Sequence, residues 1–394
     1  MYVQGAEKGR KNKAMVENYT IHVPDPVLID LDERLGRTRW PDQLEGVGWD
    51  YGTELSYLKE LCAYWKDEFD WRAQEAFLNS FSQFREEING LRVHFLHVRS
   101  CEAEALPLLI THGWPGSIVE FHKIIGPLTD PVAHGGRAED AFHVICPSLP
   151  GYAFSEAPRL PGFGAPAVAQ TLATLMAKLG YGRYGVQGGD WGAIVSSYLP
   201  QMAPGCVCGV HLNMVVAGPP AGTEDPLAGL EAKEMSALAD MGHFRKYETG
   251  YQRIQETKPQ SLGYALHDSP TGLAGWIVEK FRTWSDSDGD VESCFTKDEL
   301  LTNIMLYWVT GSITSSLRLY YESARGRSFS PDRVEVPTGV AVFPKELYRP
   351  PRAWAEAQYN IQRWTEMPSG GHFPALEEPV ALVEELRGFF RHLR

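Results

Sequence analysis

The sequence is poor in cysteine, and its few cysteines are not arranged as a metal site. Six are scattered through 394 residues: Cys62, Cys101, Cys146, Cys206, Cys208 and Cys294. Cys206 and Cys208 are separated by one residue, and no second pair accompanies them, so the spacing of a structural zinc site is missing. We therefore expect free thiols in a reducing cytoplasm, and neither a disulfide framework nor a metal centre.

Long apolar runs and an excess of positive charge are also missing. No stretch approaches the ~18 consecutive apolar residues that a membrane-spanning helix needs. The formal net charge of −13 disfavours nucleic acid or an anionic membrane as the main partner. The first residues include a small basic cluster but no apolar segment of a secretory signal. We predict that residues 1–14 form a disordered leader, with Met15 as an alternative start, and that the protein is cytoplasmic.

What is present is the composition of a globular protein, 43% hydrophobic and 22% charged. Residues 15–90 contain apolar side chains at helical spacing, which predicts amphipathic helices. From residue 91 the pattern changes to short apolar strands that end in Gly/Pro turns, such as "LPLLITHGWPGS" and "YGVQGGD", with helical segments between them. Strands that alternate with helices predict a mostly parallel sheet in an α/β domain, whose first part covers residues 91–217.

The strand pattern is interrupted between residues 218 and 330. This segment is helical in spacing and rich in tyrosine and tryptophan, so it is interpreted as a helical cap inserted into the α/β domain. Strand signals return at "VEVPTGVAVFP", and the chain closes with an apolar-striped helix. Residues 331–394 are therefore the second part of the core.

The stretch Gly188-Gly189-Asp190-Trp191-Gly192 fits the G-x-Nu-x-G pattern of a nucleophile elbow, with aspartate in place of the usual serine. In such proteins the order along the chain is nucleophile, acid and histidine. Glu346 follows the predicted strand "VAVFP", and His372 lies in the glycine-rich loop "PSGGHFPALEEP". Each signal alone is weak, but their order and their positions after strands predict a catalytic triad.

Stabilisation of an oxyanion requires two backbone N–H groups. The residue after the nucleophile, Trp191, is the expected first donor. The turn "THGWPGS" after an early strand supplies the second, for which Trp114 is the candidate. No G-x-S-x-G sequence occurs, which disfavours a serine esterase.

The motifs "RLGRTRWPD", "HGWPGS", "SLPGYAFS", "QGGDWG", "HLNM", "FPKE" and "GGHFPALEEP" occur in the family order of the microsomal-type epoxide hydrolases. The cap sequence "GYQRIQETKPQSLGYALHDSPTGLAGWIVEKF" also resembles that family, and the resemblance extends over about residues 18–394. The resemblance implies an α/β-hydrolase fold with a mostly parallel central sheet, a helical cap and an N-terminal extension that wraps the core. The apolar anchor helix of the mammalian members is missing, so we expect a soluble protein.

The resemblance also implies roles for individual residues. Asp190 matches the nucleophile, Glu346 the acid that orients the base, and His372 the base. Two cap tyrosines of the family act as hydrogen-bond donors, and Tyr251 and Tyr320 match them. Tyr247 and Tyr321 are the weaker alternatives for the two positions.

These residues suit the opening of an epoxide without a metal or an organic cofactor. A carboxylate is ionised at neutral pH, so it needs no base to attack a saturated carbon. Two phenols can donate to the alkoxide that develops. The expected partners are therefore a small-molecule epoxide and water, and a homodimer remains open. The cap aromatics Trp276, Phe281, Trp284 and Trp308 hint at an apolar or aryl epoxide.

Two other functions remain open from the residues alone. Haloalkane dehalogenases share the aspartate nucleophile and the fold, but they hold halide with N–H donors and need no phenol pair. A hydrolase-fold protein can also bind a small molecule without turnover, although a binding protein would not need the complete triad.

Overall fold

The computed structural model describes residues 16–326 and 331–394, so the predicted leader lies outside the described residues. Its centre is a nine-stranded sheet in the order β1-β2-β3-β5-β4-β6-β7-β8-β9. The first three pairings, from β1 to β5, are antiparallel, and all the others are parallel. The strands are β1 (Glu17–Asn18), β2 (Gln83–Ile88), β3 (Leu91–Val98), β4 (Leu106–Thr111), β5 (Phe142–Pro147), β6 (Tyr184–Gly188), β7 (Val207–Leu212), β8 (Val334–Val342) and β9 (Tyr359–Glu366).

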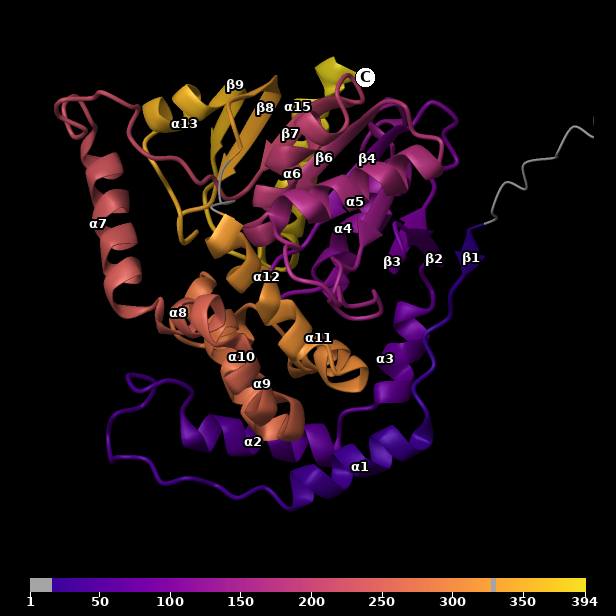
Figure 1. The fold of residues 1–394 in the computed structure, drawn as a ribbon, viewed down its shortest axis with the longest axis vertical. Coiled ribbons are helices and arrows are strands. Elements are labelled where there is room, and N and C mark those ends of the chain that lie inside the picture. The colour runs from indigo at the N-terminus through magenta and orange to yellow at the C-terminus, as the bar shows by residue number, and fades with distance from the viewer. Residues whose placement is uncertain (1–15, 327–330) are drawn as a thin grey trace, which may run out of the picture.

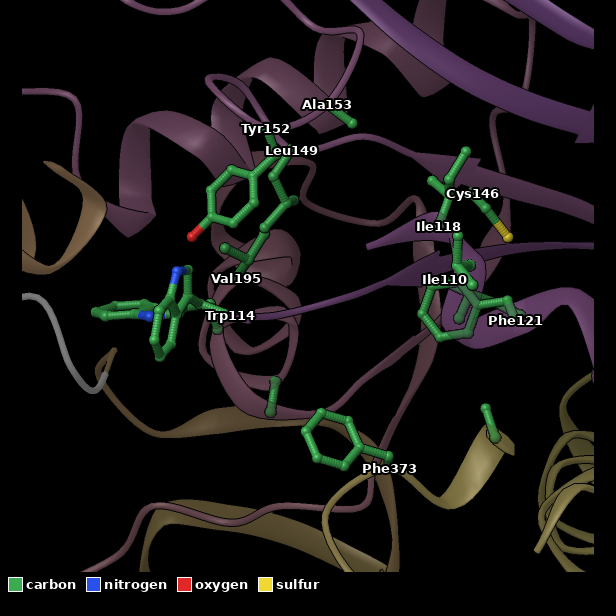
Figure 2. Packing of buried hydrophobic residues seen from close by; sticks show 14 of the residues in the cluster. Ile110, Trp114, Ile118, Phe121, Cys146, Leu149, Tyr152, Ala153, Val195 and Phe373 are labelled. Atoms are coloured by element: carbon green, nitrogen blue, oxygen red, sulfur yellow. The ribbon is translucent and has the colours of Figure 1, made fainter. Parts of the chain in front are cut away.

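Helices cover both faces of this sheet, as a mostly parallel sheet requires. One face carries α5 (Ala165–Lys178) and α6 (Asp190–Met202), which pack against each other, and the other carries α4 (His122–Thr129) and α15 (Pro379–Phe390). Two short helices, η1 (Ile118–Phe121) and α14 (Pro374–Glu377), join this second layer, and α13 (Arg352–Gln358) precedes β9. Ile110 on β4 packs beside Ile118 and Phe121 of η1 in the core (Figure 2).

The cap lies between the core and the N-terminal helices (Figure 1). It contains α7 (Ala232–Tyr247), α8 (Gly250–Thr257), α9 (Pro259–Asp268), α10 (Pro270–Trp284), α11 (Lys297–Thr310) and α12 (Ile313–Gly326). The N-terminal segment contains α1 (Asp25–Gly36), α2 (Leu55–Asp67) and α3 (Trp71–Leu78). It also supplies β1 and β2, so residues that we assigned by sequence to the extension take part in the central sheet. Within the described ranges, no helix combines the length and the apolar character that crossing a bilayer demands.

Polar contacts fix the outer side of the cap to the N-terminal helices. The Thr53 hydroxyl donates to the Gly275 carbonyl at 2.6 Å, and the Tyr64 hydroxyl donates to Asp298 at 2.9 Å. The Arg34 guanidinium donates to the carbonyl and to the carboxylate of Asp268. Since the first residues of the cap are joined to the core and its far side is held by the extension, the cap is supported from two sides.

A glycine on each of three neighbouring strands lets α15 lie close to the sheet. A Cβ atom on Gly339 of β8 would lie 2.7 Å from the Phe389 ring, and one on Gly209 of β7 would lie 2.5 Å from Leu393. A Cβ on Gly185 of β6 would collide with the Phe390 ring. The three strands therefore have glycine at the positions where the rings of Phe389 and Phe390 pack against them. This packing places α15, which is joined to the loop that contains His372 by the short helix α14.

We predict that Gly339→Ala lowers the free energy of unfolding by about 1–3 kcal/mol, because the added methyl group overpacks this contact. Urea denaturation of purified protein measures the change. Gly182→Ala is the matched control, since a Cβ added there would have no other atom within 4 Å. Equal stability of the two variants would contradict the packing account.

Candidate active site

Asp190 occupies the turn between β6 and α6, with its backbone in the left-handed region at φ 50°. A residue other than glycine rarely adopts this conformation, and it persists only where the surroundings enforce it. The neighbouring glycines do so here. A Cβ on Gly188 would collide with the carbonyl of Gly192, and a Cβ on Gly192 would collide with the carbonyl of Thr111. The tight turn places Asp190 just beyond the carboxyl end of β6.

The three predicted triad residues lie together in the structure. His372 Nδ1 is 2.8 Å from Glu346 Oε1, and His372 Nε2 is 3.3 Å from Asp190 Oδ2. Glu346 Oε1 also accepts the Leu347 N–H at 2.6 Å, whereas its buried Oε2 has no partner within the described part of the chain. His372 and Glu346 are each 3% exposed. Glu346 thus fixes the ring orientation of His372 and leaves Nε2 directed at the nucleophile.

Two carboxylates control the charge of His372. Burial by itself lowers the pKa of the imidazole, but Glu346 and Asp190 outweigh burial and hold that pKa well above its ordinary value. The imidazolium is therefore favoured while both carboxylates are ionised. Neutralising Asp190 removes one of the two, and the pKa of His372 falls. The charge of Asp190 therefore determines how strongly this ring holds a proton.

The loop after β4 supplies a backbone donor to Asp190. The Trp114 N–H donates to Asp190 Oδ1 at 2.8 Å. Gly113 permits this approach, because a Cβ there would collide with the Asp190 side chain. The loop is held by His112, whose ring is 2.9 Å from the Gly113 carbonyl through Nδ1 and accepts the Leu149 N–H at 3.2 Å through Nε2. Burial lowers the pKa of His112 to about 4, which keeps this ring neutral.

Trp191, the other predicted donor, is buried at the start of α6, next to Asp190. Its ring meets the Tyr320 ring edge to face, with centroids 4.8 Å apart. The Trp191 backbone N–H stays a prediction as the second donor to the oxyanion.

The two preferred cap tyrosines reach the site from separate helices. Tyr251 on α8 and Tyr320 on α12 are buried, and their ring centroids are 6.0 Å apart. The Tyr251 ring stacks on Trp114 at 5.4 Å, and Tyr320 meets the same indole edge to face. Burial, aided by the nearby Asp190, raises the pKa of both phenols well above its ordinary value, so both are neutral donors at pH 7.

The two alternative tyrosines lie elsewhere. Tyr247 is 61% exposed at the end of α7, and its ring lies tilted against that of His243. Tyr321 is half-buried, and the Arg325 guanidinium lies 3.4 Å from its ring centroid. Neither contacts the ring of Trp114, whereas Tyr251 and Tyr320 both do.

The four cap aromatics divide between the site and its surroundings. Trp284 packs against Trp114, Tyr251 and the His372 ring. Trp276 lines an open depression together with Tyr251, Lys280 and residues 46–52 of the extension. Phe281, in contrast, stacks on Phe373 in the core.

Trp308, the fourth, lies under Arg34 of the extension and so outside the site. Of the four, Trp284 packs at the site, where it is fully buried, and Trp276 borders the open depression.

Sequence reasoning missed Glu377, which holds the loop of His372. Its two carboxylate oxygens accept the N–H groups of Asp286, Gly371 and Phe373 at 2.8–2.9 Å. Burial raises the pKa of Glu377 to about 7, although these donors and His372 act in the opposite direction. The carboxylate thus clamps the residues on both sides of the base. Its place in "GGHFPALEEP" was visible, but its three donors were not.

Comparison with known proteins agrees with this geometry. Residues 16–121 match the family described as epoxide hydrolase N terminus, and residues 107–247 match the alpha/beta hydrolase fold family. The chain is 48% identical to an epoxide hydrolase homologue from Stigmatella aurantiaca (strain DW4/3-1) over 95% of this chain and 85% of the homologue. It is 40% identical to epoxide hydrolase 1 of Oryctolagus cuniculus over 95% and 88% of the two chains. This chain belongs to the microsomal-type epoxide hydrolase family.

A solved structure leads to the same family. Juvenile hormone epoxide hydrolase from the silkworm Bombyx mori superposes with a TM-score of 0.89 at 35% identity, over 96% of this chain and 95% of that one. The predicted α/β-hydrolase fold and the predicted activity are both confirmed: the protein is an epoxide hydrolase. No group of three or more His, Cys, Asp or Glu side chains among the described residues could hold a metal ion.

We predict that Asp190→Asn lowers the pKa of His372 relative to the unaltered protein, because one of the two neighbouring anions is removed. NMR titration of ¹⁵N-labelled histidine measures the effect. His143, on β5 and half-buried, is the internal control and should titrate identically in both proteins. An unchanged pKa of His372 in the variant would contradict the coupling between the nucleophile and the base.

Proposed function

We propose that this epoxide hydrolase converts an apolar or aryl epoxide to a vicinal diol through a covalent ester on Asp190. The observation that supports the proposal is that the two oxygens of this carboxylate have different partners. Oδ1 accepts the Trp114 N–H, whereas Oδ2 lies 3.3 Å from His372 Nε2. Oδ2 is therefore the attacking oxygen, and Oδ1 is already in the position that an ester carbonyl oxygen must take.

In the first step, Asp190 Oδ2 forms a bond to one carbon of the epoxide as the carbon–oxygen bond of the ring breaks. The strained ring supplies driving force, and the alkoxide that develops takes a hydrogen bond or a proton from Tyr251 and Tyr320. Both phenols are buried and neutral, and burial strengthens their electrostatic effect. Trp284 and Trp114 provide the apolar walls that exclude water from this step.

In the second step, the ester carries no charge, so His372 is flanked by one anion in place of two. Its pKa falls, and Nε2 becomes a base for a water molecule. The water oxygen attacks Cγ of Asp190, and Oδ1 becomes an oxyanion held by the Trp114 N–H and, in the proposal, by that of Trp191. Loss of one such donor typically costs about 2.7–4 kcal/mol in the barrier. Collapse of the intermediate restores the Asp190 carboxylate and releases the diol.

The aromatic walls favour an apolar substrate, such as a styrene-oxide type. Trp284 and Trp276, both near Tyr251, are the surfaces that would contact its apolar group. We propose in addition that the enzyme acts in natural-product synthesis or in detoxification. A homodimer and a cytoplasmic location stay predictions.

We predict that His372→Gln stalls after the first step. Intact and peptide mass spectrometry with styrene oxide should detect one added substrate mass on the peptide that contains Asp190, whereas the unaltered enzyme releases diol. Asp190→Asn is the control, and it should gain no mass. If the unaltered enzyme makes diol but His372→Gln acquires no adduct from any of several aryl and alkyl epoxides, the covalent route is wrong.

We predict that Tyr251→Phe or Tyr320→Phe slows ester formation by about 10–10²-fold. The double variant should be slowed further, because general acid catalysis typically contributes about 10²–10⁴-fold. Stopped-flow tryptophan fluorescence can follow this step, since Trp114 and Trp191 lie at the nucleophile. Tyr247→Phe and Tyr321→Phe are matched controls that should react at the normal rate. A larger loss in either control than in the paired variant would reverse the assignment.

A further inference from the structure

A small cavity lies beside the Asp190 carboxylate. Asp190, His372, Glu120, Asn213 and Gln187 line it, together with residues of the loop after β4. The cap tyrosines Tyr251 and Tyr320 do not line it. The cavity is therefore distinct from the depression that Tyr251 and Trp276 line.

This cavity has the size and the lining of a water site. The centre of a water molecule has about 10 Å³ available to it, close to the minimum that one ordered water requires. Gln187 Oε1 and Asn213 Nδ2 are buried here without a hydrogen-bond partner in the described part of the chain. Buried polar atoms of this kind normally bind an ordered water. Figure 2 shows three apolar lining residues: Trp114 and Phe121, from the loop after β4 and the helix η1 that follows it, and Phe373, from the loop of His372.

Glu120 is the one carboxyl group in this lining besides the nucleophile. It lies on η1, and its side chain folds back over Gly116, where a Cβ would collide with its carboxyl oxygen Oε1. No side chain among the described residues forms a hydrogen bond or an ion pair with this carboxyl group. Glu120 keeps some accessible surface, as expected of a group that borders a water-sized space.

We propose that Glu120 positions the hydrolytic water between itself and His372 Nε2, facing the ester carbon of Asp190. The proposal rests on the covalent mechanism proposed above, because only that mechanism needs a water on this side of the nucleophile. Glu120 does not attack the substrate. It accepts a hydrogen bond from one O–H of the water and so directs an oxygen lone pair towards Cγ of Asp190.

The step balances with the groups present. The water gives one proton to His372 Nε2 as its oxygen bonds to Cγ, and its other proton stays on oxygen, hydrogen-bonded to Glu120. The bond between Cγ and the substrate oxygen then breaks. The departing alkoxide takes a proton from the His372 imidazolium. The acid that remains on Asp190 ionises to the carboxylate, and its proton, carried by solvent, replaces the one that Tyr251 or Tyr320 gave to the first alkoxide.

The charges around the cavity are consistent with this role. Burial raises the pKa of the Glu120 carboxyl to about 8, His372 acts to lower it, and Asp190 adds to the increase. Ester formation neutralises Asp190, and this change favours the carboxylate form of Glu120, the stronger acceptor, while the water is being oriented. As His372 then takes up a proton from the water, its positive charge favours that form further.

Glu120→Met and Glu120→Gln test the proposal. Methionine keeps an unbranched chain over Gly116 but removes the acceptor, and glutamine keeps one acceptor oxygen. With styrene oxide, stopped-flow fluorescence should give ester formation within about twofold of the unaltered rate in both variants. Hydrolysis of the ester should slow by about 10²-fold in Glu120→Met, as for a misplaced reactant, and by less in Glu120→Gln. Glu104→Gln, on the exposed surface, is the control.

The outcomes separate three cases. Selective slowing of hydrolysis, with a thermal midpoint near that of the unaltered enzyme, supports the proposal. Normal hydrolysis in Glu120→Met would mean that Glu120 only fills space. Equal slowing of both steps would mean that Glu120 supports the loop of Trp114. Either result overturns the proposal. Failure of the covalent mechanism itself would be recognised separately, because His372→Gln would then acquire no adduct.

Discussion

The active site depends on the left-handed backbone of Asp190. The conformation is unfavourable for aspartate, and the close packing of β6, α6 and the end of β4 enforces it through Gly188 and Gly192. One consequence is that the carboxylate meets the Trp114 N–H with one oxygen and His372 with the other. A nucleophile on a relaxed turn would not present two oxygens to two different partners.

The second constraint is electrostatic, and in the proposed mechanism it links the two chemical steps. His372 is placed between two carboxylates, so its affinity for a proton depends on whether Asp190 is ionised. In that mechanism, attack on the substrate removes the charge of Asp190 and so changes the base. The surrounding residues keep the geometry fixed while the charges change: Glu346 holds Nδ1, and Glu377 clamps the backbone on both sides of the ring.

Much of this site could be predicted from the sequence, because its key residues sit in short motifs next to turn-forming glycines. Asp190, Glu346 and His372 follow strands in the expected order, and the structure brings them together. Tyr251 and Tyr320 could be placed only by resemblance, since nothing in a helical segment marks which tyrosine faces the core. The neighbouring Tyr321 shows how a difference of one position turns a ring away from the site.

Other parts could not be predicted, for physical reasons. The roles of Glu377 and Glu120 depend on backbone donors and on a cavity assembled from distant segments, which leave no local pattern. The participation of β1 and β2 in the sheet depends on pairing across the end of the extension. Trp284 was noted for its aromatic character alone, and its contact with the His372 ring follows from the packing of the cap on the core.

The placement of the cap between the core and the N-terminal helices also determines which segments surround the approach to the cap tyrosines. Hydrogen bonds from Thr53, Tyr64 and Arg34 hold the outer side of the cap, so it is not a hinged lid with a free edge. Residues 46–52 of the extension line one open depression together with Tyr251 and Trp276 of the cap. A loop far from Asp190 in the sequence thus forms part of the surface beside a residue that is proposed to act on the substrate.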